Sequence, residues 1–375
     1  MTDKGWWALT LFMLCGCAQP PKRIEHDAYI WQRRWDDSLL KAIKEATPAV
    51  RAWRVLAAEV DAAGHVTPVA VNWEALRGTG KPVIAVVRMQ RLVNVVQNWP
   101  VNGIEIDYDC ATSQLRAYQD FLHALSGKTP LSITALPSWM DSSELPGLLD
   151  EVDESVLQVH SVMNAKKGLF DRRTAYGWAR RWAGMSSKPF RIALPTYWSK
   201  VSWNSEGKVE AVESEATRYG IGDESHELFV EPGEVSAFVA ELRKAPIRGL
   251  EGIAWFRLPT NEDERAWTLQ TWRAVMEGRT MTRAVPVVRV KQGAEGLRDV
   301  YLQSDRDGRL PAEILVASQG CEFADAMEPY TLDRERERVR FRLRGDDAIL
   351  RAGQERMVGW VRCTGKELEA HVSVE

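Results

Sequence analysis

The stretch NGIEIDYD, Asn102 to Asp109, alternates apolar and acidic side chains and is typical of a single β-strand. Glu105, Asp107 and Asp109 occupy every second position, with isoleucine or tyrosine between them. Successive side chains of a strand point to opposite faces, so the pattern predicts three carboxylates in a row on one face. Burying charged groups is costly unless they are paired or made neutral, so this strand needs a special environment.

Strand-like runs recur along the chain on both sides of this one. They cover residues 28–35, 51–60, 82–89, 103–109, 131–139, 155–162, 190–198 and 250–259. Helical spacing follows most of these runs, most clearly at 113–125, 174–184, 233–245 and 263–278. Eight strand–helix units in about 250 residues predict a parallel (β/α)8 TIM barrel, with functional side chains at the carboxyl ends of the strands. A doubly wound open sheet is the alternative, but no glycine-rich phosphate loop follows the first strand.

The pattern changes near residue 283. Short strand-like runs separated by polar turns continue to the end of the chain, with no convincing helix between them. We therefore expect three parts: a signal segment at 1–17, a barrel at 18–282 and a small β-sandwich at 283–375. A hairpin is expected within the long polar segment 200–231, at residues 203–212.

The N-terminus has the features of an export signal. Lys4 precedes the apolar run WWALTLFMLCGC, which is too short to span a bilayer and is followed by polar residues. Its end resembles the processing box of bacterial lipoproteins, with Leu14, Gly16 and Cys17 in the corresponding places. The resemblance implies a lipid anchor on Cys17 and, with Ala18 next, an outer-membrane location facing the periplasm or the cell surface. An ordinary cleaved signal peptide stays open as the alternative.

Composition limits the partners that the chain can bind. A net charge of −3 and scattered basic residues argue against a nucleic-acid partner. No Cys/His spacing of the zinc type occurs, so we expect neither a metal nor another cofactor, and we expect a monomer. In an oxidising compartment Cys321 and Cys363 could form a disulfide, although two separate buried thiols would fit the sequence nearly as well. Sixteen tryptophans provide flat apolar faces that suit either a core or a sugar ring.

The predicted strand ends carry carboxylates, arginines and aromatic rings that a barrel would gather on one rim. Besides the three acids of the fourth strand, the candidates for contacts with a substrate are Gln32, Arg33, Glu59, Arg88, Trp139, His160, Tyr197, Trp255 and Arg257. Together they fit a pocket for a polar, ring-shaped molecule, so the expected partner is a polysaccharide or an oligosaccharide.

The acidic strand resembles the fourth-strand motif of the family 18 glycoside hydrolases, the chitinase-like barrels. In that resemblance Glu105 and Asp107 match the supporting carboxylates, and Asp109 falls at the position of the general acid. Trp255 is similar to the tryptophan that forms the floor of the family's sugar site, and Tyr197 to a phenol that positions the substrate. The sequence departs from the motif in having Asp at the tip and Glu at the first acid. The overall plan also resembles an uncharacterised family of bacterial lipoproteins with a glycosidase-like barrel.

Closely spaced acids explain how such a strand could act in catalysis. Like charges a few ångström apart cannot all ionise cheaply, so inner acids share a proton and raise the pKa of their neighbour. We expect Asp109 to protonate a glycosidic oxygen and Asp107 to orient it and exchange the proton, with Glu105 as support. Glu59 or Asp61, across the rim, could serve as base or nucleophile.

Two alternatives remain open at this stage. The three acids could pair with Arg33, Arg34 and Arg88 in an ion-pair network that only fills the barrel. The protein would then be a carbohydrate-binding or envelope-assembly lipoprotein with a degenerate glycosidase barrel, instead of a membrane-anchored glycoside hydrolase acting on an envelope or extracellular polysaccharide.

Overall fold

The computed structural model describes residues 24–95, 98–125, 127, 129–160, 168–206, 209–213, 224–317, 321–335, 338–345, 348–364 and 369–372. The expected signal at 1–17, with Cys17, lies outside these residues. Within the described part of the chain, no helix combines the length and the apolar character needed to cross a membrane.

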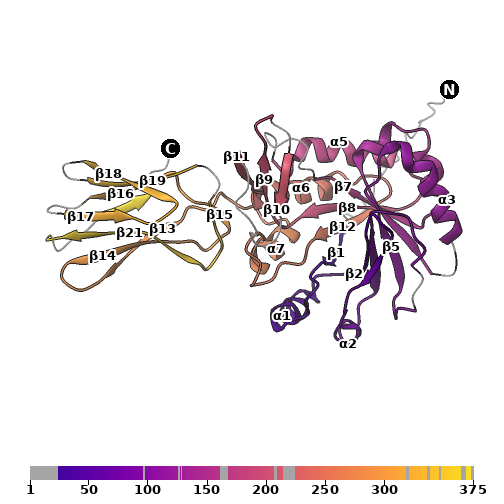
Figure 1. Cartoon of the computed structure of the whole chain (residues 1–375), viewed down its shortest axis with the longest axis horizontal. Coiled ribbons are helices and arrows are strands. Elements are labelled where there is room, and N and C mark those ends of the chain that lie inside the picture. Colours follow the sequence, from indigo (N-terminus) through magenta and orange to yellow (C-terminus); the bar gives the residue numbers. More distant parts are fainter. Residues whose placement is uncertain are drawn as a thin grey trace, which may run out of the picture.

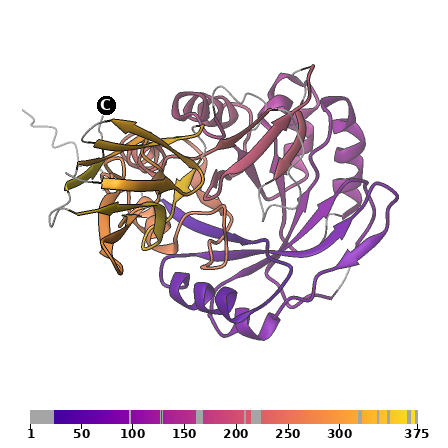
Figure 2. The same cartoon turned by 60° about the vertical axis from the view of Figure 1, so that its left-hand side comes forward.

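The first part of the chain is a closed parallel barrel, as the sequence predicts (Figures 1 and 2). Its strands are β1 (Glu25–Ile30), β2 (Ala52–Val60), β4 (Val83–Met89), β5 (Gly103–Asp107), β6 (Leu131–Ala135), β7 (Glu154–Gln158), β8 (Phe190–Pro195) and β12 (Leu250–Phe256). Strand β1 pairs in parallel with both β2 and β12, and this closes the ring. A short strand β3 (Val66–Pro68) lies antiparallel to β2. The fold class is therefore confirmed.

Helices cover the outside of the barrel. They are α1 (Asp37–Ala46), α2 (Trp73–Arg77), α3 (Leu115–Leu125), α4 (Leu145–Asp150), α5 (Arg172–Ala183), α6 (Pro232–Lys244) and α7 (Leu269–Met276), with 3-10 turns η1 (Thr112–Gln114) and η2 (Pro137–Asp141). Local sequence explains where they begin, because Asp36 and Asp171 accept hydrogen bonds from the first turns of α1 and α5. The longer helices bury an apolar stripe against the strands, whereas α2 buries only Leu76.

The last helix of the barrel is shorter than its sequence pattern predicts. The expected helix at 263–278 begins only at Leu269, after the N-cap residue Thr268. The preceding residues form a loop, in which Ala266 bridges to Tyr197 and Trp267 donates a backbone hydrogen bond to Thr196. Contacts with the β8 end therefore override the helical spacing there.

Charged side chains fill the amino-terminal half of the barrel interior. Arg54 is fully buried, and its guanidinium contacts Asp27, Glu105 and Glu154. Asp27 also accepts a hydrogen bond from Arg51 at 2.7 Å, and Nε of Arg191 lies 2.9 Å from Glu154. Buried charges of both signs thus balance one another at the bottom of the barrel, where apolar layers are usual.

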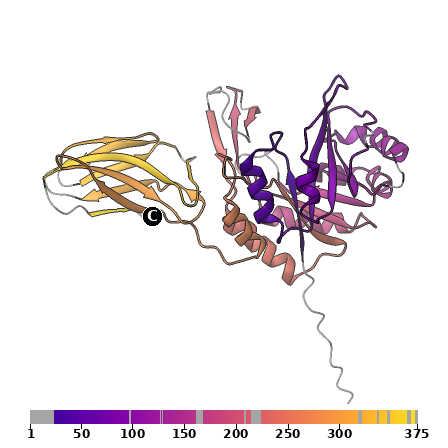
Figure 3. The same ribbon diagram turned by 90° about the horizontal axis from the view of Figure 1, so that it is seen from below.

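A small sheet inserted after β8 lies on the side of the barrel that faces the C-terminal domain (Figures 1 and 3). Strand β9 (Ser199–Trp203) pairs with β10 (Val209–Glu213) on one side and with β11 (Glu224–Leu228) on the other. The hairpin expected at 203–212 is therefore present.

The C-terminal domain consists of antiparallel sheets, as expected for a small β-sandwich. One sheet contains β13 (Val287–Gln292), β14 (Leu297–Gln303), β21 (Glu355–Cys363) and β17 (Cys321–Ala326). The other contains β18 (Tyr330–Glu335), β19 (Arg338–Leu343), β16 (Glu313–Ala317) and β22 (Glu369–Val372), and β15 (Gly308–Arg309) pairs with β20 (Ile349–Leu350). The domain has its own apolar core, and a disulfide links Cys321 to Cys363 at its edge.

One buried arginine joins this domain to the barrel. Arg351, next to β20, donates hydrogen bonds to the backbone carbonyls of Thr260, Asn261 and Asp263 in the loop after β12. Nearby, Asp307 accepts a hydrogen bond of 2.6 Å from the backbone N–H of Thr268 at the start of α7. The C-terminal domain therefore fixes the loop that follows the last barrel strand.

We expect Arg351→Ala to lower the free energy of unfolding by about 2–4 kcal/mol, because buried carbonyls lose a charged donor. Calorimetry should show that the barrel of this variant unfolds at a lower temperature. Arg338→Ala, on the exposed face of β19, is the matched control and should keep the transition temperature of the native protein. Equal transition temperatures for the two variants would contradict this role.

Candidate functional site

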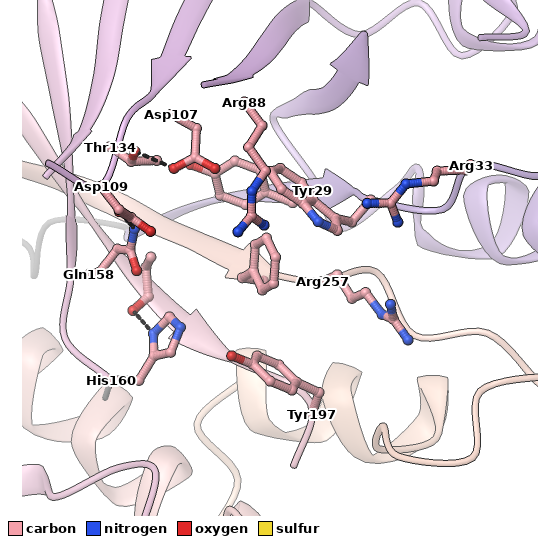
Figure 4. A pocket seen from close by; sticks show the side chains of 13 residues that line it. Tyr29, Arg33, Arg88, Asp107, Asp109, Thr134, Gln158, His160, Tyr197 and Arg257 are labelled. Carbon is pink, nitrogen blue, oxygen red and sulfur yellow. Dashed lines mark hydrogen bonds between the residues drawn. The ribbon is translucent and has the colours of Figure 1, made fainter. Parts of the chain in front are cut away.

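A cavity of about 260 Å³ opens at the carboxyl ends of the barrel strands (Figure 4). It brings together seven of the residues that the sequence nominates: the acids Asp107 and Asp109, the arginines Arg33, Arg88 and Arg257, and the rings of His160 and Tyr197. Their elements lie far apart in the chain, and closure of the barrel places them around one space.

The acids of β5 and its extension lie in a column whose exposure increases toward the mouth. Glu105 is fully buried, Asp107 is 7% exposed and Asp109 is exposed. Glu105 accepts a hydrogen bond of 2.6 Å from the hydroxyl of Tyr29 and is paired with Arg54 beneath the cavity. Burial raises the pKa of Glu105, although Arg54 opposes this effect. Glu105 is thus a supporting group that does not line the cavity.

The ion-pair network proposed for the whole column is wrong in its partners. Arg54 pairs with Glu105, whereas Arg33, Arg34 and Arg88 do not. Asp107 and Asp109 form no ion pair with any residue in the part of the chain that the structure describes. The two upper acids therefore lack the direct counter-charge that a purely structural role would require.

The two upper acids have raised pKa values for physical reasons. Asp107 accepts a hydrogen bond of 2.6 Å from Thr134, and Asp109 one of 3.1 Å from Gln158. Burial first, and then the charge of Asp109, raise the pKa of Asp107 to about 7, while Thr134 and Arg88 lower it. Removal from bulk water by the cavity walls also raises the pKa of Asp109, with Arg88 opposing. Near neutral pH the pair therefore holds a shared proton.

Aromatic rings form the floor of the cavity around Phe256. The centroid of the Phe256 ring lies 4.8 Å from Trp31, 5.5 Å from Tyr29, 5.7 Å from Tyr197 and 6.4 Å from His160. The peptide bond from Phe256 to Arg257 is cis. The rings of Tyr29, Trp31 and Tyr197 stand at 60° to 69° to Phe256, so the cluster presents both ring faces and ring edges as an apolar wall against which a ring-shaped ligand can pack.

Two tryptophans expected in the site belong to the core instead. Trp255 is fully buried on the outer face of β12, where its indole nitrogen lies 3.1 Å from Nδ1 of His26 and its ring packs against Trp272. Trp139 is also fully buried and donates a hydrogen bond of 3.0 Å to the carbonyl of Cys110. In β12 it is Phe256, one residue later, that points into the barrel.

Three polar residues expected on the rim do not line the cavity. Glu59 forms two hydrogen bonds with Arg33, at 2.8 and 2.7 Å, and this pairing lowers the pKa of Glu59. Gln32 donates to the carbonyl of Leu258 at 2.9 Å, and Asp61 is exposed beside His65. The expectation that Glu59 or Asp61 faces the acids as base or nucleophile is therefore wrong.

His160 and Tyr197 keep their neutral forms in the cavity wall. Nδ1 of His160 lies 3.3 Å from the carbonyl of Ala193, which can only accept, so we assign the proton to Nδ1 and leave Nε2 as an acceptor. Burial lowers the pKa of His160 to about 4 and raises the pKa of Tyr197 to about 12. Both side chains can bind ligand hydroxyl groups without carrying charge.

Sequence reasoning missed six lining residues: Tyr29, Trp31, Thr134, Gln158, Ala193 and Phe256. Strands β1 and β6 end earlier than the apolar runs do, at Ile30 and Ala135, and this shifted the positions taken as strand tips. The alternation of side chains, counted from the true strand ends, is the signal that would have found them.

A second cavity of about 240 Å³ adjoins the first and also includes Arg88, Asp107 and Asp109 among its lining residues. The two acids consequently lie between two spaces. No group of three or more His, Cys, Asp or Glu side chains suited to a metal ion occurs among the described residues.

Two family models match parts of the chain. A family model described as a domain of unknown function (DUF3142) matches residues 79–261, and another (DUF8456) matches residues 287–364. A search of curated proteins finds no match. These results do not connect the chain with any described activity.

Solved structures include similar barrels. The spore cortex-lytic enzyme SleL from Bacillus cereus aligns with a TM-score of 0.51 at 14% identity, over 70% of this chain and 76% of that one. SleL from Bacillus megaterium aligns with a TM-score of 0.51 at 13% identity, over 71% of this chain and 77% of that one. A chitinase from Chromobacterium violaceum aligns with a TM-score of 0.47 at 13% identity, over 68% of this chain and 98% of that one. Identity this low shows the fold alone, a (β/α)8 barrel.

The raised pKa of Asp107 predicts a pH-dependent loss of stability. An acid that keeps its proton longer in the folded state stabilises that state at low pH, and this contribution disappears as the pH rises from about 4 through 7. Asp107→Asn should therefore gain stability over the native protein as the pH rises, on the order of 2–4 kcal/mol by pH 8. Urea unfolding at pH 5 and pH 8 measures this, with the exposed Asp120→Asn on α3 as control. A pH-independent difference between Asp107→Asn and the native protein would contradict the assignment.

Proposed function

We propose that the chain is a membrane-anchored glycoside hydrolase that acts on an envelope or extracellular polysaccharide, with Asp109 as the general acid. The observation that carries the proposal is the pair of protonatable acids, Asp107 and Asp109, between two cavities at the barrel mouth. A glycosidic bond needs sugar residues on both sides of the acid that protonates it, and two adjoining cavities provide such spaces. The similar barrel of the spore cortex-lytic enzymes SleL supports this proposal.

The proposed reaction uses the shared proton of the pair. Asp109, the more exposed acid, donates its proton to the glycosidic oxygen as the bond between that oxygen and the anomeric carbon breaks. This transfer uses the one proton of the pair, so Asp107, which accepts a hydrogen bond from Thr134, and Asp109 are both carboxylates until a proton returns. A water molecule later adds to the anomeric carbon and returns a proton to Asp109, which restores the starting state.

The cavity wall offers few groups that could act as the nucleophile. Among the described residues that line the first cavity, Asp107 and Asp109 are the only carboxylates; Asp107 ends β5 and Asp109 lies two residues beyond it, so they do not face each other across the cavity. A mechanism with two facing carboxylates is therefore not supported. The nucleophile is then a water molecule or a group of the substrate itself, as in substrate-assisted hydrolases.

The aromatic and neutral polar side chains that line the first cavity favour a second candidate function, which is carbohydrate binding without cleavage. A cavity with an aromatic floor and neutral hydrogen-bonding side chains binds sugar rings whether or not a nucleophile is in place. The protein would then be an envelope-assembly or glycan-binding lipoprotein.

Assays of glycan cleavage separate the two candidates. The full-length protein, kept in a detergent without a sugar headgroup, is incubated with chitin, peptidoglycan strands, polygalactosamine and exopolysaccharides, and released reducing ends are measured. We expect release from at least one of these glycans, and Asp109→Asn should reduce the rate by about 100-fold or more because the proton donor is lost.

Asp120→Asn, on the exposed surface of α3, is the matched control and should keep full activity. Binding of a glycan without release of reducing ends would replace the enzyme proposal with the binding one. If no glycan is bound or cleaved, both candidates fail.

The membrane anchor is a separate part of the proposal and has its own test. Cys17→Ser should move the protein from the membrane fraction to the soluble fraction and abolish incorporation of a labelled fatty acid, because the thiol that carries the lipid is missing. The neighbouring Cys15→Ser should leave both properties unchanged. Fatty-acid labelling that survives Cys17→Ser would rule out this anchor.

A further inference from the structure

The first cavity has two walls of opposite character (Figure 4). Asp107 and Asp109 come from the end of β5 on one side, and Arg33 and Arg257 from beyond the ends of β1 and β12 lie on the other, with Arg88 between them. Three arginines from three separate elements converge on about 260 Å³. The arrangement is bipolar, with the acids and the cations kept apart.

Two of the arginines are held from behind by carboxylates that do not line the cavity. Glu59 binds Nε and Nη2 of Arg33 at 2.8 and 2.7 Å. Asp263 binds Nη2 of Arg257 and is itself fixed by the backbone N–H of Thr260 at 2.7 Å. These pairs orient the guanidinium groups before any ligand arrives, which lowers the entropy cost of binding.

Arg88 differs from the other two in its contacts. Its guanidinium carbon lies 5.9 Å from the centroid of the Trp31 ring, and the side chain is exposed to the cavity. Within the described residues it forms no ion pair, so its charge acts on Asp107 and Asp109 only across a distance. A planar guanidinium that stacks on an aromatic face can still form a bidentate pair of hydrogen bonds with a carboxylate.

We propose that the sugar bound in this cavity carries a carboxylate, which Arg88 binds with help from Arg33 or Arg257. The acids do not oppose this arrangement, because they lie on the other wall and share one proton near neutral pH. The sugar ring then packs on Phe256, its carboxylate meets the arginines, and its glycosidic oxygen lies on the side of Asp109. This inference rests on the proposed function and specifies the substrate class of the same site.

Matched pairs of sugars that differ in one acidic group test the inference directly. Glucuronic acid is compared with glucose, galacturonic acid with galactose, and N-acetylmuramic acid with N-acetylglucosamine, by NMR titration of the full-length protein in a detergent without a sugar headgroup. We expect the acidic member of at least one pair to bind about tenfold more tightly than its neutral partner. The preference should shrink as NaCl rises from about 20 mM to about 500 mM, because salt screens the charges.

Arg88→Met should abolish the preference while leaving weak binding of the neutral sugar, and Arg88→Lys should restore part of it. Arg116→Met on the exposed face of α3 is the control and should keep the full preference. Equal affinity for both members of every pair overturns the inference, and the proposed function survives if reducing ends are still released from a neutral glycan. If none of the six sugars binds, the inference is overturned, and the release assay then decides separately whether the proposed function stands.

Discussion

The buried ion pair between Arg54 and Glu105 is the contact on which the chemistry of the barrel depends. Arg54 also pairs with Asp27 and Glu154. Its single positive charge is therefore balanced by carboxylates that lie below the cavity. No cation of this network reaches the next acid upward, Asp107, which has a hydroxyl partner instead. A buried carboxyl with a hydroxyl and no direct cation retains its proton to higher pH. Because no direct cation offsets its burial, Asp107 has a raised pKa, and the charge of Asp109 adds to this effect.

The sequence predicts the barrel well because eight apolar runs recur with helices between them, and this signal is local. It also predicts the face of the acids on β5, where polar and apolar residues alternate. Strand β12 offers no such alternation, since Ile253 to Phe256 are all apolar, and either face could be the inner one. Only the register with β8, where Trp255 lies opposite Leu194, places Trp255 outside and Phe256 inside. Seven of the fourteen tryptophans in the described part of the chain are likewise buried core residues, and Trp31 is the one that lines the first cavity there.

Contacts between distant segments are the part of the site that no local pattern could predict. Arg351 in the C-terminal domain holds the carbonyls around Asp263, and Asp263 holds Arg257 in the cavity wall. An arginine beside a two-residue strand has no sequence feature that distinguishes it from the many exposed arginines of the same domain. The structure shows that the domain does more than extend the molecule, since it helps to position one wall of the cavity.

The aspartate at the tip of β5 constrains where a substrate must lie. A glutamate would reach further by one methylene, about 1.5 Å, so a glycosidic oxygen must approach the backbone of β5 more closely to meet Asp109. Gln158 holds Asp109 from the β7 side at 3.1 Å, and Thr134 holds Asp107 from the β6 side, so neither acid is free to swing outward. The ring must then lie deep, against Phe256, and this is the position from which a substituent can also reach Arg88. The short acid and the arginine wall thus favour the same placement of the sugar.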